Sequence, residues 1–465
     1  MNENPNSAGP SRRAFLRGSA GMFASLALPL RLVEEQRPHF APRAKSVLFL
    51  FMLGAPSQLD LFDPKPKLQQ LDGQPMPDSL VAGAVVDQLK GRNLVAAGSR
   101  FAFAPRGQCG MQLSELLPHL GGHADRLALV RSMTSTIINH VPAQQMLTTG
   151  SIEAGRPSCG SWVAHALGSD NGNLPAFAAL LSGGDPGDPP PPPHLWANGF
   201  LPGKSSGVVL QSGAEAVRFL ADPPGTTRDG RAQQLQTLAA LDRLRQGQHG
   251  HPATDDRIDA YRLAFRMQAE VPEATDLGSE SPATMALYGA EAGSRSFANN
   301  CVMARRLLER GTRFVQLVDD GWDHHGQLVR RLRQKAGEVD RPIAALLTDL
   351  ACRGMLDETL VVFAGEFGRT PMNQGGQGGD RYGRDHHGRC FSIWMAGAGI
   401  RGGAVVGATD ELGFDVVDSP FTVHDLQATI LHLLGFDHER LTFRHRGRDY
   451  RLTDVHGQVM RAVLA

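Results

Sequence analysis

Short, almost uninterrupted apolar runs recur along the chain, and each predicts a β-strand that is buried on both faces. The segments between several of these runs carry apolar residues at helical spacing. Strands that alternate with helices in this way are typical of an α/β protein with a mostly parallel central sheet. The predicted strands are residues 45–53, 127–130, 312–318, 360–364 and 390–395, with further apolar segments at 175–181 and 208–210.

Capping residues indicate where the predicted helices begin and end. The helix that starts near residue 143 has its stop at Gly150. The next helix, residues 162–167, follows Ser158 and Ser161, and either serine suits an N-cap. Further helices are predicted at 231–246, 256–268, 295–310, 328–353 and 422–434. We expect the helices within residues 225–311 to form an insertion or a layer that covers the sheet.

Residues 1–30 are expected to be an export signal. Arg12 and Arg13 precede Phe15 and Leu16, and a modest apolar segment follows at residues 21–30. This order is typical of a twin-arginine signal peptide, which would be recognised by the twin-arginine export machinery and deliver the protein to the periplasm or cell envelope. The alternative is a disordered basic terminus. The apolar segment is too short for a stable membrane anchor, and no other span of near twenty apolar residues occurs.

Residues 44–465 are expected to form a single domain, because no linker is long and polar enough to divide them. The hydrophobic content is 41% and the formal net charge is zero, so nothing favours nucleic acid as a partner. The five cysteines lie far apart without a CxxC pair, which excludes a zinc ribbon or a thioredoxin-like motif.

Ligand-type side chains follow three of the predicted strands, at or beyond the point where each strand ends. If these strands are parallel, their ends lie along one edge of the sheet and the side chains converge there. Carboxylates brought together repel one another unless a cation compensates them. Carboxylate oxygens together with imidazole nitrogens suit one or two divalent ions, with zinc, manganese or iron favoured over calcium. The candidate metal ligands are Asp60, Asp323, His325, Glu366, Asp385 and His386.

A structural explanation of the same residues stays open. Asp63-Pro64 would then start a turn, and Asp60 would be solvated. Asp323 would be the N-cap of the helix that follows it. We expect a glycine-rich loop after residues 365–370, which would carry Asp385 and His386 at its far end.

Three further residues are candidates for catalysis. Arg369 and Arg384 flank the acidic cluster and could hold an anionic substrate by paired hydrogen bonds. The alternative is that they form ion pairs with Glu366 or Asp385. His140 lies near a predicted helix start, where free N–H groups and the helix dipole attract anions. It could be a ligand, a general base or a nucleophile, or a histidine held by the backbone.

The chain resembles the bacterial family called domain of unknown function 1501. The resemblance extends from near Ser46 to Val459. It rests on GAPSQLDLFDPKP, RSMTSTIINH, GRPSCGSW, GWDHHG, GEFGRTP, GRDHHGRCFSIWMAGAGIRGG, GATDELGF and HDLQATILHLLGFDHERLTFRHRGRDYRLTDVHG. The family is similar to the alkaline phosphatase and sulfatase superfamily. This implies a three-layer α/β/α sandwich, two metals at the strand ends and a nucleophile at a helix N-terminus.

Carried over by this resemblance, one metal site is kept and the other is altered. Asp323, His325 and His386 stand where the superfamily has ligands of one metal. Glu366-Phe367 stands in place of an Asp-His pair of the second site, so the acid is kept and the histidine is lost. Leu53-Gly54 stands where the superfamily has an aspartate at the end of the first strand.

Two further departures concern the nucleophile and the family's own pattern. No serine, threonine or cysteine occupies the position of the nucleophile near Asn139-His140. Within the family pattern, Ala55 and Gln58 replace an expected glycine and histidine. The Cys-x-Pro-Ser-Arg motif of formylglycine sulfatases is also absent.

Together these features predict an exported metal-dependent hydrolase of phosphate or sulfate esters. Its partner would be an anionic ester, either a small molecule or a polysaccharide. The competing hypothesis is a catalytically degenerate protein of the same fold that binds or scaffolds in the cell envelope. The altered second metal site favours this alternative.

Overall fold

The computed structural model describes residues 37–77, 89, 93–183, 190–213, 216–217, 222, 225–249, 253–375 and 381–465. The signal peptide expected at residues 1–30 lies outside this part of the chain. Among the described residues, no helix combines the length and the apolar character needed to cross a membrane.

Eight strands of the described chain form the central sheet, in the order β12-β4-β11-β8-β1-β7-β5-β6. Strand β11 runs antiparallel to its neighbours β4 and β8, whereas the other pairs are parallel. The mostly parallel sheet predicted from the apolar runs is therefore confirmed. The strands are β1 (Ser46–Met52), β4 (Leu127–Met133), β5 (Phe177–Gly183), β6 (Val208–Leu210), β7 (Phe314–Asp320), β8 (Thr359–Ala364), β11 (Phe391–Ala396) and β12 (Ala404–Val406).

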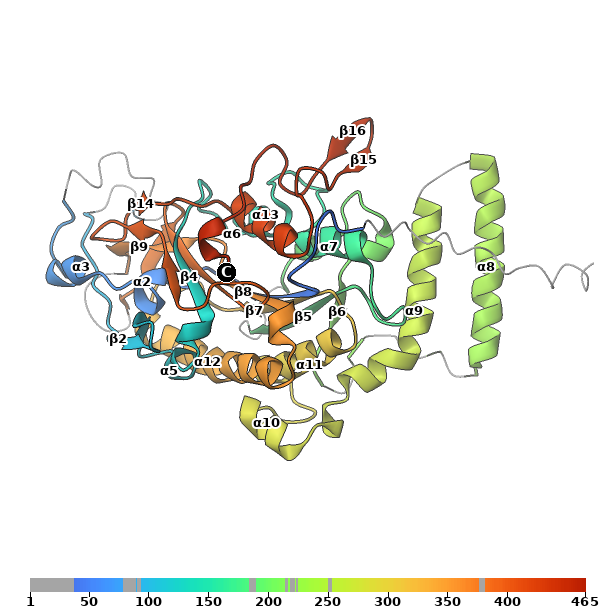
Figure 1. Ribbon diagram of the computed structural model, residues 1–465, viewed down its shortest axis with the longest axis horizontal. Helices are drawn as coiled ribbons and strands as arrows, with labels where there is room; N and C mark the ends of the chain where they lie inside the picture. The colour runs from blue at the N-terminus through green and yellow to red at the C-terminus, as the bar shows by residue number, and fades with distance from the viewer. Residues whose placement is uncertain are drawn as a thin grey trace, which may run out of the picture. The chain divides into compact units, whose positions relative to one another are not determined.

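Helices cover both faces of the sheet (Figure 1). Alternate residues of β1 enter two separate apolar cores, with Leu50 in one and Phe49 and Phe51 in the other. The first core is closed by α11 (Phe297–Glu309) and α12 (Leu328–Cys352). The second is closed by α6 (His140–Thr149), α7 (Cys159–Leu167) and α13 (Val423–Leu433). This arrangement is the predicted three-layer α/β/α sandwich.

The long helices α8 (Arg228–His249) and α9 (Ala253–Thr275) stand beside each other at one end of the molecule (Figure 1). A cavity of about 1870 Å³ is lined by these helices and by residues between 203 and 217. None of the candidate site residues lines this cavity. The short helix α10 (Pro282–Tyr288) follows and packs against α11 and α12.

The predicted caps of α6 and α7 are confirmed. Gly150 ends α6 in the left-handed conformation, with φ of 69°. Ser158 caps α7 by accepting a hydrogen bond from the backbone N–H of Ser161. Helix α6 begins at His140, earlier than the apolar spacing indicated, because Pro142 is tolerated in the first turn of a helix. His140 is thus the first residue of the helix.

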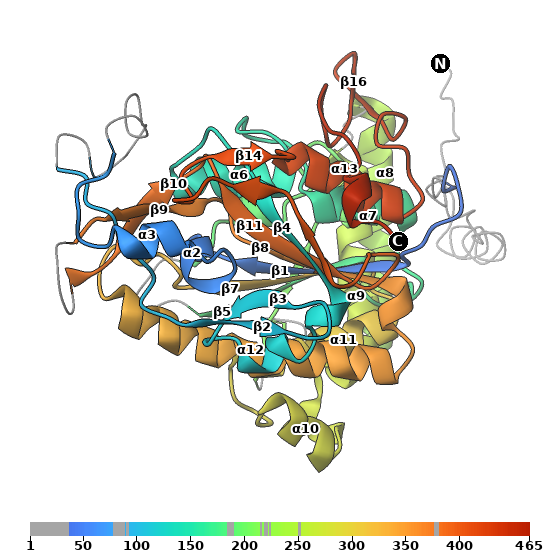
Figure 2. The ribbon, with the colours of Figure 1, turned by 60° about the vertical axis from the view of Figure 1, so that its left-hand side comes forward.

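Two strands that the sequence did not predict form a β-hairpin on either side of the glycine-rich segment, so the loop expected from residue 371 begins only after residue 373. Strands β9 (Gly368–Asn373) and β10 (Arg384–His387) pair antiparallel, with His386 opposite Arg369 (Figure 2). A Cβ atom at Gly368 would lie 2.2 Å from the carbonyl oxygen of Cys390, so the strand starts at a position where only glycine fits. Glycines between the two strands hid their pairing from the sequence pattern.

A buried ion pair ties the segment after β1 to this hairpin. Asp60, in the short helix α2 (Gln58–Leu61), lies 2.7 Å from Nε of Arg384, and both side chains are fully buried. The remaining donors of Arg384 reach the carbonyl oxygen of Thr370 and the hydroxyl of Tyr382. The two residues therefore hold each other inside the protein.

Replacing Asp60 with alanine is expected to lower the free energy of unfolding by about 3–5 kcal/mol, because the Arg384 guanidinium would stay buried without its counter-ion. Urea unfolding followed by circular dichroism measures the loss. The matched control is Asp449→Ala, which breaks the exposed Arg444–Asp449 pair. That substitution is expected to cost less than about 1 kcal/mol. Equal losses in the two variants would contradict the structural role of the buried pair.

Candidate metal centre

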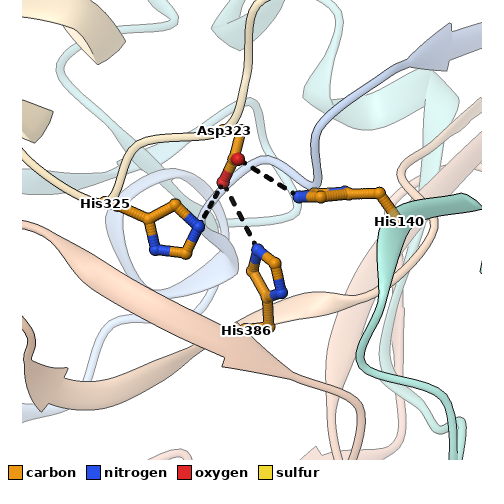
Figure 3. Close-up of side chains that lie close together, drawn as sticks. All are labelled: His140, Asp323, His325 and His386. Atoms are coloured by element: carbon orange, nitrogen blue, oxygen red, sulfur yellow. Dashed lines mark hydrogen bonds and ion pairs between the residues drawn. The ribbon is translucent and has the colours of Figure 1, made fainter. Parts of the chain in front are cut away.

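The carboxyl ends of β1, β7 and β8 lie side by side, because β1 pairs in parallel with both other strands. Four side chains gather beyond this edge: His140 at the start of α6, Asp323 and His325 after β7, and His386 on β10 (Figure 3). One ligand atom from each of the four lies within 4.8 Å of those from the other three. Imidazole nitrogens and a carboxylate at this spacing suit a metal ion.

Asp323 is the centre of this cluster. Its Oδ1 lies 3.0 Å from Nε2 of His325 and 3.4 Å from Nε2 of His386. Its Oδ2 lies 3.3 Å from Nε2 of His140 (Figure 3). All three histidines therefore turn the same ring nitrogen toward one carboxylate.

The other ring nitrogen of each histidine contacts an oxygen behind the cluster. Nδ1 of His140 lies 2.6 Å from Oε1 of Glu366. Nδ1 of His325 lies 2.5 Å from Oε1 of Gln374, and Nδ1 of His386 lies 2.7 Å from the carbonyl oxygen of residue 138. An acceptor at Nδ1 holds the proton there and leaves the lone pair of Nε2 facing the centre. This outer hydrogen bond is what metal-binding histidines almost always make.

The environment of one atom of the cluster indicates whether the four residues suit a cation. Nε2 of His140 is buried and makes no hydrogen bond to the described residues, although it lies 3.3 Å from Oδ2 of Asp323. A buried ring nitrogen without a hydrogen-bond partner is costly. A cation bound at this atom would remove that cost.

Glu366 lies behind His140 and outside the four-residue cluster. Its carboxylate is buried and accepts hydrogen bonds from the backbone N–H groups of Gly54 and Ala55 and from the side chain of Gln144. Burial raises the pKa of Glu366, but the hydrogen bond and charge of His140 outweigh burial, so the pKa is lowered. Glu366 is thus an ionised residue that orients His140.

Arg369 holds Asp323 from the other side. Its Nη2 donates to Oδ1 of Asp323 and to the carbonyl oxygen of Gly54, each at 2.6 Å. Its backbone is held in turn by Gln58, which accepts from the Arg369 N–H and donates to its carbonyl oxygen. Burial alone would raise the pKa of the Asp323 carboxyl, but the three histidines and Arg369 keep that pKa far below its usual range.

The histidines of this region differ in basicity. Burial lowers the pKa of His140, but Asp323 and Glu366 outweigh burial and raise it to about 9. The pKa of His325 is also raised, since its hydrogen bond to Asp323 outweighs burial. Burial lowers the pKa of His386, and it lowers the pKa of His324 to about 3. His324 contacts the carbonyl oxygen of Gly321 and is not part of the cluster.

The backbone explains why no carboxylate follows β1 directly. Gly54 has a φ of 108°, and a Cβ atom on it would lie 2.6 Å from the backbone nitrogen of Asp323. A side chain at this position would displace Asp323 from the cluster. The aspartate that the superfamily resemblance implies here is therefore incompatible with this backbone.

The structure places the remaining sequence candidates elsewhere. Asp60 and Arg384 are paired with each other, as described above. Asp385 is buried and accepts a hydrogen bond from the backbone N–H of Leu89. The cluster thus brings together three of the candidate ligands and adds His140, which was first considered for catalysis.

Two groups of the site could not be identified from the sequence. Gln374 lies among glycines, with no local pattern to mark it. The carbonyl oxygen of residue 138 belongs to the backbone and has no sequence signal at all. Family alignments that showed Gln374 to be invariant would be the signal that could reveal it.

The centre is open to solvent on one side. The exposed fractions of the side chains are 41% for Asp323, 26% for His325 and 22% for His140, compared with 6% for His386. A catalytic metal site keeps a position for water or substrate, whereas a structural site is closed by protein ligands. The exposure of these three residues leaves room for such a position.

Comparison with solved structures finds 105 matching chains. They include a sulfatase from Pseudoalteromonas sp., with 13% identity over 91% of this chain and 72% of that chain and a TM-score of 0.38. A phosphonate monoester hydrolase from Silicibacter pomeroyi matches with 12% identity, 90% and 76% coverage and a TM-score of 0.34. A protein in the alkaline phosphatase superfamily from Vibrio parahaemolyticus matches with 11% identity, 86% and 68% coverage and a TM-score of 0.36.

These TM-scores all lie below 0.5, so no conclusion about chemistry rests on them. A comparison with curated proteins gave no match. The sequence itself matches a family model over residues 44–464, and that model is described as a protein of unknown function, DUF1501. The chain therefore belongs to the DUF1501 family, as its motifs indicated.

Proposed function

We propose that this protein is an exported, metal-dependent hydrolase of phosphate or sulfate esters. One observation carries the proposal: three histidines direct Nε2 toward Asp323, while an oxygen behind each ring contacts Nδ1. Histidines whose Nδ1 is fixed from behind while Nε2 faces a shared centre are typical of metal ligands. The proposed centre holds one divalent ion between His140, Asp323, His325 and His386.

The ligand types narrow the choice of ion. Three imidazole nitrogens and one carboxylate oxygen suit zinc, manganese or iron, whereas calcium prefers oxygen ligands alone. An ion of this kind, when bound, polarises an ester oxygen and lowers the pKa of water. The proposed substrate is an anionic ester, either as a small molecule or on a polysaccharide.

The residues around the centre have distinct tasks in this proposal. Glu366 and Gln374 fix the orientation of His140 and His325. Arg369 keeps Asp323 ionised and in place. Water is the proposed attacking group, because a bound ion of this kind lowers the pKa of water.

A second candidate function is a binding or scaffolding role in the cell envelope without turnover. The observation in its favour is that the three candidate carboxylates outside the cluster all have partners within the protein. Asp60 is paired with Arg384, Glu366 accepts from Gly54 and Ala55, and Asp385 accepts from the backbone N–H of Leu89. A single metal centre is thus compatible with anion binding as well as with hydrolysis.

The purified protein is expected to bind one equivalent of zinc, manganese or iron per chain and to hydrolyse an aryl phosphate or sulfate ester. Asp323→Ala is expected to abolish turnover and to weaken metal binding by more than about 100-fold, because outer residues of a metal site alone contribute 10–100-fold. Elemental analysis measures the bound metal, and release of 4-nitrophenol measures turnover.

The matched control for this experiment is His456→Ala, which removes an exposed histidine outside the cluster. This variant is expected to keep both the metal and the turnover. Failure of the wild-type protein to bind any of the three metals would remove the basis of the proposal. Metal binding that depends on Asp323, without turnover of any ester, would favour the binding role.

Export is expected to depend on the arginine pair. Replacing Arg12 and Arg13 with lysine should leave the precursor in the cytoplasm, because the twin-arginine machinery reads the pair itself. Cell fractionation followed by immunoblotting measures its distribution. Arg17→Lys, a change of the same kind outside the pair, should be exported normally. Normal export of the double variant would contradict the twin-arginine assignment.

A further inference from the structure

The charged side chains of the described residues around the metal centre provide little net positive charge to attract an anionic substrate. Asp323 and Glu366 are carboxylates whose partners are hydrogen-bond donors, and Arg369 is the guanidinium that contacts Asp323. Two negative charges and one positive charge give a sum of minus one. Histidines that bind the ion through Nε2 keep one proton each, on Nδ1, and add no charge. A divalent ion would bring the sum to plus one.

The neighbouring Asp60–Arg384 pair is neutral by itself and does not change this sum. On this count of the described side chains, the site with its ion is therefore singly positive.

The two arginines beside the site cannot donate paired hydrogen bonds to a substrate. Arg369 directs Nε to the carbonyl oxygen of Ala55, Nη1 to that of Arg384, and Nη2 to Gly54 and Asp323. Arg384 uses all three of its nitrogens on protein acceptors. Both side chains are at most 1% exposed. Paired hydrogen bonds from arginine are the usual means of holding the oxygens of a doubly charged phosphate.

From this balance we propose that the substrate is a singly charged tetrahedral ester, and that a doubly charged phosphate monoester is discriminated against. Sulfate monoesters and phosphodiesters share this single charge. A single negative charge neutralises the singly positive site, whereas a double charge leaves an uncompensated negative charge in a partly buried place, which is costly. The inference rests on the proposed function, because it concerns the substrate of the same centre.

The first test compares three substrates with the same leaving group on the metal-loaded full-length protein at pH 8.5. They are 4-nitrophenyl sulfate, methyl 4-nitrophenyl phosphate and 4-nitrophenyl phosphate, of which the last is doubly charged because its second pKa is near 6. One singly charged ester is expected to show a kcat/KM at least about tenfold above that of the doubly charged ester. The singly charged ester with the higher kcat/KM shows whether the substrate is a sulfate monoester or a phosphodiester. A higher value for the doubly charged ester, or a difference below tenfold, overturns the inference and leaves the hydrolase proposal standing.

The second test measures binding and needs no turnover. Phenylphosphonate is doubly charged at pH 8.5, and its monomethyl ester is singly charged with nearly the same shape. Isothermal titration calorimetry on the metal-loaded protein is expected to give a Kd at least about threefold lower for the monomethyl ester. Equal or tighter binding of phenylphosphonate, or no binding of either compound, overturns the inference. If no ester is hydrolysed in the first test, the hydrolase proposal fails, and this binding order still decides the charge preference.

Discussion

The convergence of three histidines on the carboxylate of Asp323 is the constraint on which the rest of the site depends. One carboxylate and three imidazole rings meet at this point only if each is held in place by a further group. Arg369 provides a counter-charge for Asp323, and oxygens behind the rings fix the histidines. The fold supplies these groups from segments far apart in sequence.

The turn after β1 links the two halves of this arrangement. The N–H of Gly54 donates to Glu366 behind His140, and its carbonyl oxygen accepts from Arg369 behind Asp323. Ala55 adopts a φ of 59°, which a residue with a Cβ rarely does, and its own N–H and carbonyl oxygen bind the same two partners. A glycine there would adopt this conformation with less strain. The tight approach of Gly54 to Asp323 leaves no room for a side chain at this position.

The sequence was sufficient to predict the fold because its strongest signals are periodic. Five apolar runs became strands of one sheet, and Gly150 and Ser158 cap their helices as their chemistry requires. Strand ends that meet at one edge predicted that ligand-type side chains converge, and the family resemblance grouped Asp323 and His325 with His386. The hairpin β9–β10 escaped prediction because glycines around residue 375 lack a strand pattern.

The roles of the remaining residues depend on contacts that no local pattern encodes. Asp60 and Arg384 are 324 positions apart, and only the folded chain shows that they neutralise each other. Glu366 follows a strand as a ligand would, but the N–H groups of Gly54 and Ala55 turn it toward the protein and behind His140. A spacing pattern indicates which residues reach the edge of the sheet, whereas the direction of each side chain is set by its partners.

The most direct measurement of the central claim is the anomalous diffraction of crystals of the zinc-loaded protein. The account predicts one zinc ion per chain, about 2.0–2.1 Å from Nε2 of His140, His325 and His386 and about 2.0–2.2 Å from an oxygen of Asp323. A metal bound through Nδ1 of these histidines would contradict it. So would a second ion held by Glu366, or a zinc ion that leaves the four residues uncoordinated.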